Sequence, residues 1–275
     1  MNITVLLENR TISKEYKNKH GLSLYIETSK HKILFDTGTD STFAENARKL
    51  GVKLEDVDLA VISHGHYDHG GGLETFLKLN DTAKIYIGKG AFDSHLIKVL
   101  GIFNYSIGLK KKLSTNSRFV FVDGLVEIDD ELTVFGNIIG SKLLPEGNDE
   151  LLKKYSDGKV GKDDFEHEIS LMIRERERYT LLCGCAHKGI VNILERARSV
   201  INRNVNTVIG GFHLMGLNIR DKKSREFLDE LSAVLNKNKS DKYYTCHCTD
   251  DQAYNYLRQS VSNLDLIRTG MVFEV

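Results

Sequence analysis

The sequence predicts an α/β protein in which two β-sheets lie face to face between outer layers of helices, a four-layer αββα sandwich. Two observations support this fold class. Strand patterns alternate with amphipathic helix patterns, and each half of the chain carries strands, then histidine-bearing loops, then helices. The 275 residues contain no linker, no short tandem repeat and only one proline, Pro145. We therefore expect a single domain over residues 1–275, with a lid or insertion around 88–166.

The N-terminal half begins with strands and continues with strand–helix units. In the second strand, Leu22, Leu24 and Ile26 alternate onto one face. The first helix is expected to begin with a capping box formed by Thr42 and Glu45. In chain order, we expect strands at 3–8, 22–27, 31–36, 57–62 and 84–87, and helices at 42–50 and 72–79.

The C-terminal half repeats this alternation. Its clearest helix spans 189–201, where apolar residues recur at helical spacing. The last helix is expected to begin with a capping box of Thr249 and Gln252. We expect strands at 118–122, 125–128, 131–135, 168–174, 178–183, 205–210, 242–245, 264–268 and 271–275, and helices at 189–201, 222–235 and 250–258.

The region 88–166 fits the alternation least well. It holds the aromatic residues Phe92, Phe103 and Tyr105 and a basic cluster at 110–112. Long excursions from compact domains are often lids or binding loops, and an elaborated edge with solvated charges is the alternative. If they face a pocket, these aromatic and basic residues would suit a flat, phosphorylated ligand.

The loop after the strand at 57–62 carries the most informative residues of the chain. His64, His66, Asp68 and His69 lie within six positions, and three glycines follow them. Imidazole and carboxylate groups hold zinc, iron or manganese in hydrolytic sites. The glycines allow the backbone to turn tightly after the ligands. This pattern predicts a metal site at the end of the strand.

The H-x-H-x-D-H pattern resembles the signature of the metallo-β-lactamase superfamily. In that family a histidine follows a later strand, an acidic residue follows another, and a last histidine lies near the C-terminus. His187 in Gly-Cys-Ala-His matches the first of these, and His247 in Cys-His-Cys matches the last. His213 in Gly-Gly-Phe-His stands where the family usually has an aspartate. These stretches also resemble one subfamily, described as 7,8-dihydropterin-6-methyl-4-(β-D-ribofuranosyl)aminobenzene-5′-phosphate synthase-like proteins.

The resemblance covers nearly the whole chain and implies the metallo-β-lactamase type of αββα sandwich. It also divides the ligands into a three-nitrogen site of His64, His66 and His187 and a second site of Asp68, His69 and His247. One or two divalent transition metals are implied, zinc first, with iron, manganese or nickel as alternatives. Asp68 is also a catalytic candidate, because a carboxylate can orient a nucleophile or pass a proton.

His213 departs from the family pattern, because a neutral imidazole cannot bridge two metals as an aspartate does. Three roles stay open for it: metal ligand, catalytic contact to the substrate or its proton, and structural residue. The change leaves the second site less anionic, so we expect that site to hold its metal more weakly.

Other residues near the motifs have simpler interpretations. Asp36 ends a strand and is expected to fix a turn or orient a ligand. A lone histidine is usually a surface or core residue, and this is the simplest interpretation of His95 and His167. Either one can instead orient a metal ligand. The remaining histidines, His20 and His31, carry no signal of their own.

Four cysteines form two C-x-C pairs around ligand histidines. They are Cys183, Cys185, Cys246 and Cys248. Small buried side chains are the first interpretation, and an iron–sulfur cluster is the alternative. Strand geometry would place Cys183 and Cys185 on the same face as His187.

Composition narrows the classes of function. Lys+Arg and Asp+Glu both total 38, so the net charge is zero, which argues against a broad nucleic-acid surface. No apolar run has the length of a membrane span, and the N-terminus reads as a strand rather than a signal peptide, so we expect a cytoplasmic protein. The oligomeric state is not predicted.

Three functions are consistent with these residues. The first is a metal-dependent hydrolase that acts on a small ester, lactone or phosphate-containing substrate. The second is a transferase that condenses a pterin diphosphate with an arylamine, as the subfamily resemblance implies. The third is a non-catalytic metal or electron-transfer protein. For the enzymes, the expected partner is a small molecule, including phosphorylated and pterin-like compounds.

Overall fold

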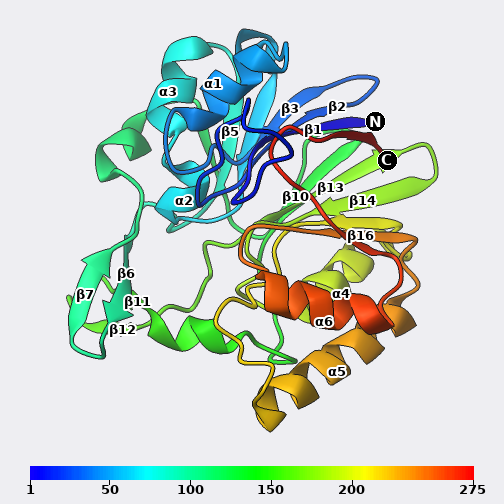
Figure 1. Cartoon of the computed structure of the whole chain (residues 1–275). Coiled ribbons are helices and arrows are strands. Elements are labelled where there is room, and N and C mark those ends of the chain that lie inside the picture. The colour runs from blue at the N-terminus through cyan, green and yellow to red at the C-terminus, as the bar shows by residue number, and fades with distance from the viewer.

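The computed structural model describes residues 1–275 and contains two seven-stranded sheets packed face to face, with helices on both outer faces (Figure 1). This is the four-layer αββα sandwich that the sequence predicts. The two chain ends lie together at one end of the sandwich, where the Met1 amino group donates to the Val275 carbonyl over 3.0 Å.

The first sheet is built by the N-terminal half and the last strand of the chain. Its order is β18-β1-β2-β3-β4-β5-β8, and β3, β4, β5 and β8 run parallel. The bounds are β1 (Asn2–Leu7), β2 (Ser23–Glu27), β3 (Lys32–Phe35), β4 (Leu59–Ile62), β5 (Lys84–Gly88), β8 (Phe119–Val122) and β18 (Val272–Glu274). The parallel strands bring their carboxyl ends to one edge.

The second sheet follows the same plan. Its order is β17-β16-β15-β14-β13-β10-β9, and β14 to β17 run parallel. The bounds are β9 (Leu125–Glu127), β10 (Leu132–Phe135), β13 (Ser170–Glu175), β14 (Arg178–Leu182), β15 (Thr207–Ile209), β16 (Lys242–Thr245) and β17 (Leu264–Leu266). Polar loops therefore leave both sheets where parallel strands end.

Helices cover the outer faces, and three hydrophobic clusters hold the layers together. Phe43 and Phe76 lie in the cluster beneath the helices of the first sheet, and Leu194 and Leu228 lie in that of the second. A third cluster joins the facing sheets. The helices are α1 (Thr42–Lys49), α2 (Tyr67–Gly70), α3 (Leu73–Leu79), α4 (Ile190–Ile201), α5 (Lys222–Asn238) and α6 (Asp251–Ser260), with 3₁₀ helices η1 (Leu54–Asp56), η2 (Lys111–Thr115) and η3 (Glu146–Glu150). None of these helices combines the length and apolar character that a membrane span requires.

The two capping boxes predicted at Thr42 and Thr249 are wrong. The Thr42 hydroxyl donates to Asp40 over 2.6 Å, and α1 has no side-chain cap at its first residue. In α6 the cap is Asp250, whose carboxylate accepts the N–H of Ala253 over 2.8 Å. At each start a neighbouring aspartate supplies the acceptor, because a carboxylate is a stronger acceptor than a hydroxyl.

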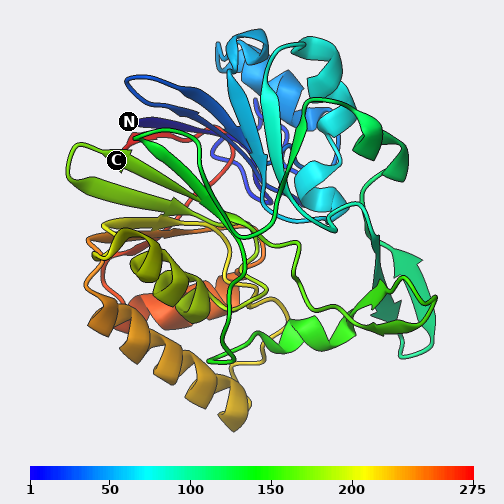
Figure 2. The ribbon, with the colours of Figure 1, turned by 180° about the vertical axis from the view of Figure 1, so that it is seen from behind.

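Part of the region 88–166 forms a third sheet, which we call the side sheet. Its order is β12-β11-β6-β7, and both views place it to one side of the sandwich (Figures 1 and 2). The bounds are β6 (Ser94–Val99), β7 (Phe103–Ser106), β11 (Leu151–Lys154) and β12 (Val160–Lys162). The rest of the region supplies β8, β9 and β10 to the sandwich, so only part of it leaves the two main sheets.

Candidate metal centre

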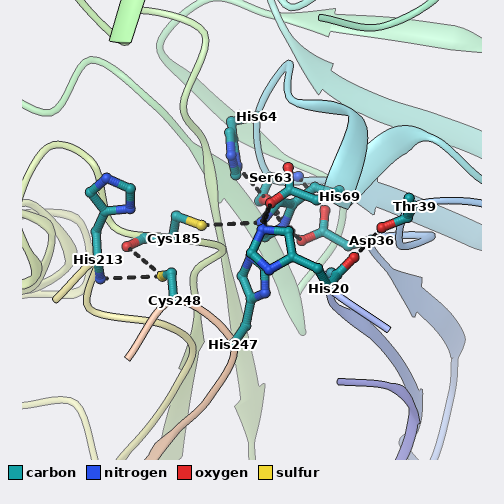
Figure 3. A network of polar contacts seen from close by, with 12 residues as sticks. His20, Asp36, Thr39, Ser63, His64, His69, Cys185, His213, His247 and Cys248 are labelled. Atoms are coloured by element: carbon teal, nitrogen blue, oxygen red, sulfur yellow. Dashed lines mark hydrogen bonds and ion pairs between the residues drawn. The ribbon is translucent and has the colours of Figure 1, made fainter. Parts of the chain in front are cut away.

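The predicted ligands come from loops that follow parallel strands in both sheets. The loop after β4 carries His64 and His66, and the short helix α2 that follows it carries Asp68 and His69. The loops after β14 and β16 carry His187 and His247. Because the carboxyl ends of these strands face each other across the sandwich, side chains from both sheets meet, as the ring pairs His64–His187 and His69–His247 show. Figure 3 shows His64, His69 and His247 of this set. The structure thus brings together both groups of residues that the sequence resemblance implies.

The first group consists of three buried imidazoles. The ring centroids of His64 and His66 are 4.6 Å apart, those of His64 and His187 4.8 Å, and those of His66 and His187 4.9 Å. The Nε2 atoms of His64 and His187 approach to 3.3 Å. The three rings therefore surround one point, as ligands of a single cation do.

The second group contains a carboxylate. The Oδ2 atom of Asp68 lies 3.1 Å from His247 Nε2 and 3.9 Å from His69 Nε2. His20 adds a third nitrogen 3.2 Å from the same oxygen, and its side chain is 45% exposed. The sequence reasoning missed His20, which lies in a loop with no pattern of its own.

Four of these histidines are held by oxygen acceptors on the side of the ring that faces away from the centre. Each oxygen accepts the Nδ1–H of one ring, so the Nε2 lone pair is presented to the centre. The pairs are His64 with Ser63 Oγ at 3.0 Å, His69 with Asp36 Oδ2 at 2.6 Å, His187 with Asn148 Oδ1 at 3.0 Å, and His247 with Asn9 Oδ1 at 2.9 Å. Asp36 orients a ligand as expected, whereas Asn9 and Asn148 were not anticipated.

His66 is backed by a different arrangement, a buried cluster of His95, Asp163 and His167. Asp163 accepts from His95 Nδ1 over 2.7 Å and lies 3.4 Å from His167 Nε2. His167 Nδ1 in turn accepts the N–H of Gly65 over 2.9 Å. A ligand atom of His66 lies within 4.8 Å of ligand atoms of all three. The two histidines considered as supports thus lie behind His66, joined by an aspartate that the sequence did not single out.

Two buried carboxylates fix the backbone of the distant ligand loops. Glu168 accepts the N–H groups of His187 and Lys188 over 2.7 and 2.8 Å, and Glu8 accepts the N–H of His247 over 2.6 Å. Burial raises the pKa of Glu168 to about 7 and also raises the pKa of Glu8. Each loop is therefore held by a buried carboxylate from another part of the chain, 19 residues from His187 in one case and 239 residues from His247 in the other.

The two ligand groups differ in charge. Burial, followed by repulsion from neighbouring histidines, lowers the pKa values of His64, His66 and His187 well below the usual range, so these rings are neutral. At Asp68 burial opposes ionisation, but His69, His20 and His247 outweigh it and hold the pKa well below its usual value. At His69 burial opposes protonation, but Asp36 and Asp68 prevail and raise the pKa. Neutral imidazoles and an ionised carboxylate are the forms that bind metal.

His213 lies beside the first group. Its ring centroid is 4.2 Å from that of His187, and its buried Nδ1 has no hydrogen-bond partner (Figure 3). The backbone adopts φ 50°, and the N–H donates to Cys248 Sγ over 3.2 Å. The two preceding glycines permit a close approach to cysteines: a Cβ on Gly211 would lie 2.3 Å from Cys248 Sγ.

The four cysteines are unpaired and buried, but they occupy different surroundings. Cys183 lies in the cluster beneath α4 to α6, Cys246 lies between the sheets, and Cys185 and Cys248 reach the centre. The prediction that Cys183 and Cys185 share the face of His187 is wrong. Strand β14 ends at Leu182 and Ala186 adopts φ 58°, so the alternation of an extended strand stops before the ligand.

A cavity of about 330 Å³ opens onto the centre. Ligand residues form its floor, and the side sheet contributes apolar wall residues such as Ile97 and Leu151. Neither lysine nor arginine is among its lining residues. Phe103 and Tyr105 are exposed on β7, and Lys110 pairs with Glu74, so the features expected to suit a phosphorylated ligand lie outside this cavity.

The chain is similar to proteins of known family. A family model described as the metallo-beta-lactamase superfamily matches residues 18–157. An uncharacterised protein of Methanocaldococcus jannaschii is 31% identical over 94% of both chains. The 7,8-dihydropterin-6-methyl-4-(beta-D-ribofuranosyl)-aminobenzene-5'-phosphate synthase of the same organism is 28% identical over 94% of this chain and 90% of its own length. A crystal structure described as a metal-dependent hydrolase of the beta-lactamase superfamily superposes with a TM-score of 0.83 at 28% identity, covering 100% of this chain and 99% of the other.

Proposed function

Because this chain belongs to the metallo-β-lactamase superfamily, we propose that it is a metal-dependent hydrolase of a small ester, lactone or phosphate-containing substrate. The observation that carries this proposal is the convergence of ligand residues from both sheets on two adjoining groups beside one cavity. Divalent metals in such a site lower the pKa of water and polarise the bond to be cleaved. Zinc suits these nitrogen and oxygen donors best, with iron, manganese and nickel as alternatives.

The proposed ligands fit a metal in orientation, and the three histidines of the first group and Asp68 also fit it in protonation. One site would be held by His64, His66 and His187, and the other by Asp68, His69 and His247. Oxygen acceptors behind four of the rings fix the tautomer that leaves Nε2 free. Without a cation, the Nε2 lone pairs of the neutral His64 and His187 rings would face each other over 3.3 Å in a buried site.

Asp68 and His213 are the proposed catalytic residues. The Asp68 carboxylate is ionised and lines the cavity, so Oδ2 can orient a water molecule and accept its proton. His213 also lines the cavity, and its partnerless Nδ1 can donate a hydrogen bond to the substrate or carry a proton to the leaving group. Apolar residues of the side sheet would limit the access of bulk water.

The cavity favours hydrolysis of a substrate with little charge away from the reacting group. A diphosphate usually needs arginine or lysine partners, and the cavity lining contains neither. The transferase alternative is favoured by one finding, the 28% identity over 94% of the chain to a named pterin-related synthase.

The test combines metal analysis with a ligand screen. The protein is purified without added metal, its metal content is measured, and thermal shifts are recorded with esters, lactones, phosphate esters and pterins. A hydrolase would bind metal and turn over a member of the first three classes. Binding of pterins without hydrolysis would favour the transferase instead, and metal with no turnover of any substrate would favour an electron-transfer or storage role.

A further inference from the structure

The sulfur of Cys185 lies between the two ligand groups. Its Sγ is 3.1 Å from His69 Nε2 in the second group. It also lies within 4.8 Å of ligand atoms of His64 and His187, and within 4.8 Å of those of His69 and His247 (Figure 3). Cys185 is thus shared by residues assigned to both metal sites.

The net charge of the proposed ligands indicates that an anion would be favourable at the position of Cys185. The two proposed sites contain five neutral or basic imidazoles and one carboxylate, Asp68. Two divalent cations would bring four positive charges into a buried space, where repulsion between like charges is strong. Two further carboxylates lie close by, but Asp36 is committed behind the ring of His69 and Asp163 between His95 and His167. A second anion placed between the cations would relieve this imbalance.

We propose that Cys185 is a ligand of this metal centre and binds as a thiolate shared by the two sites. The inference rests on the proposed metal centre. On binding, the thiol loses its proton to solvent and the sulfur lone pairs form the metal bonds. A thiolate selects zinc or iron over manganese, because it is a soft ligand.

The backbone around Cys185 is shaped to present the sulfur at this point. Gly184 lies against the β4 loop so closely that a Cβ there would meet Ser63 Oγ at 2.1 Å. Ala186 adopts φ 58°, which turns the chain between Cys185 and His187. The side chain of Cys185 is buried at 3% exposure, so its position is fixed by packing.

Another cysteine provides a matched control. Cys183 is equally buried but lies in the hydrophobic cluster beneath α4 to α6. Cys248 does not serve as a control, because its Sγ accepts the N–H of His213 and lies with Cys185 and His213 in a group of possible ligands. The comparison of Cys185→Ser with Cys183→Ser separates loss of the shared ligand from loss of a buried thiol.

The test uses cobalt(II) in place of the native metal. Wild type should bind two cobalt ions and show a near-ultraviolet thiolate-to-cobalt charge-transfer band. Cys185→Ser should lose this band and bind the second ion at least about tenfold more weakly, while the Cys183→Ser control keeps both properties. Persistence of the band in a folded Cys185→Ser protein, or two bound ions without a band in wild type, would overturn the inference.

X-ray absorption on zinc-loaded wild type requires no variant. A sulfur neighbour at about 2.3 Å from zinc is expected. Bound zinc with only nitrogen and oxygen neighbours would overturn the role of Cys185 and leave the hydrolase proposal intact. Wild type that binds no metal at all would overturn the metal centre itself.

Discussion

The two halves of the candidate metal centre are built differently. His64, His66 and His187 are neutral, almost fully buried and gathered around one point. The group of Asp68, His69 and His247 is charged, and the partly exposed His20 lies against its carboxylate. The difference teaches that one fold can place a neutral group of ligands and a more polar group side by side, both of them buried.

The residues that support the ligands of the two groups also come from different parts of the fold. Behind His66 lies the cluster around Asp163, which belongs to the segment that follows the side sheet. Behind His69 lies Asp36, at the end of β3 within the main sandwich. The first group is therefore tied to the side sheet, whereas His69 depends on the core of the first sheet. Substitutions in the side sheet should therefore alter the position of His66 before that of His69.

The largest expected effect comes from removal of a ligand in the first group. His66→Ala should abolish tight binding of one metal and reduce turnover by more than about 10²-fold, because the remaining imidazoles cannot complete the site. Metal content and circular dichroism are measured on the purified variant. His31→Ala is the control, since His31 contacts Asp129 far from the centre. Undiminished tight metal binding in folded His66→Ala would remove His66 from the ligand set.

A charge-removing change in the second group should have the next largest effect. Asp68→Asn keeps the size of the side chain and loses its charge, so turnover should fall by about 10²-fold and the second metal should bind more weakly. Asp123→Asn is the control, because Asp123 pairs with Lys89 on the surface. Turnover of Asp68→Asn at the wild-type rate would make Asp68 a structural residue.

His213 distinguishes a contact to the substrate from a metal ligand. Because Cys185 occupies the shared position in our proposal, His213→Ala should lower turnover about tenfold or more and leave both metals bound. His213→Asp should tighten the second metal only if residue 213 reaches it. Metal stoichiometry and affinity are compared for the three proteins. Loss of a metal from His213→Ala would make His213 a ligand.

The fold was predictable because its signals are local. Periodic apolar residues marked the helices and strands, and the histidines were visible where the β4 strand ends. Asp36, His95 and His167 could be named as supports of the ligands, but Asn9, Asn148 and Asp163 could not, because they act across long sequence distances from loops without periodicity. The position of Cys185 was also hidden, since the left-handed Ala186 interrupts the strand alternation on which the expectation relied.

The smallest effect expected is a difference in how the two sites respond to acid. Protons compete with metal for a histidine only near or below its pKa. The pKa values of His64, His66 and His187 are lowered, so protons should displace the first metal only well below the usual range of histidine. The pKa of His69 is raised by Asp36 and Asp68 against the effect of burial, so protonation of His69 begins at higher pH. As the pH falls from neutrality, the second metal should therefore leave first, in a step resolved from the other.

Equilibrium dialysis at successive pH values, followed by metal analysis, measures these two steps. Asp68→Asn identifies them, because it weakens the second site and should move only the step at higher pH. The step at lower pH should remain at its wild-type position, since none of the three histidines has been changed. Loss of both metals in one step, or a shift of the lower step in Asp68→Asn, would show that the two groups act as one coupled site. In that case the contrast in charge between them would not translate into a difference in metal affinity.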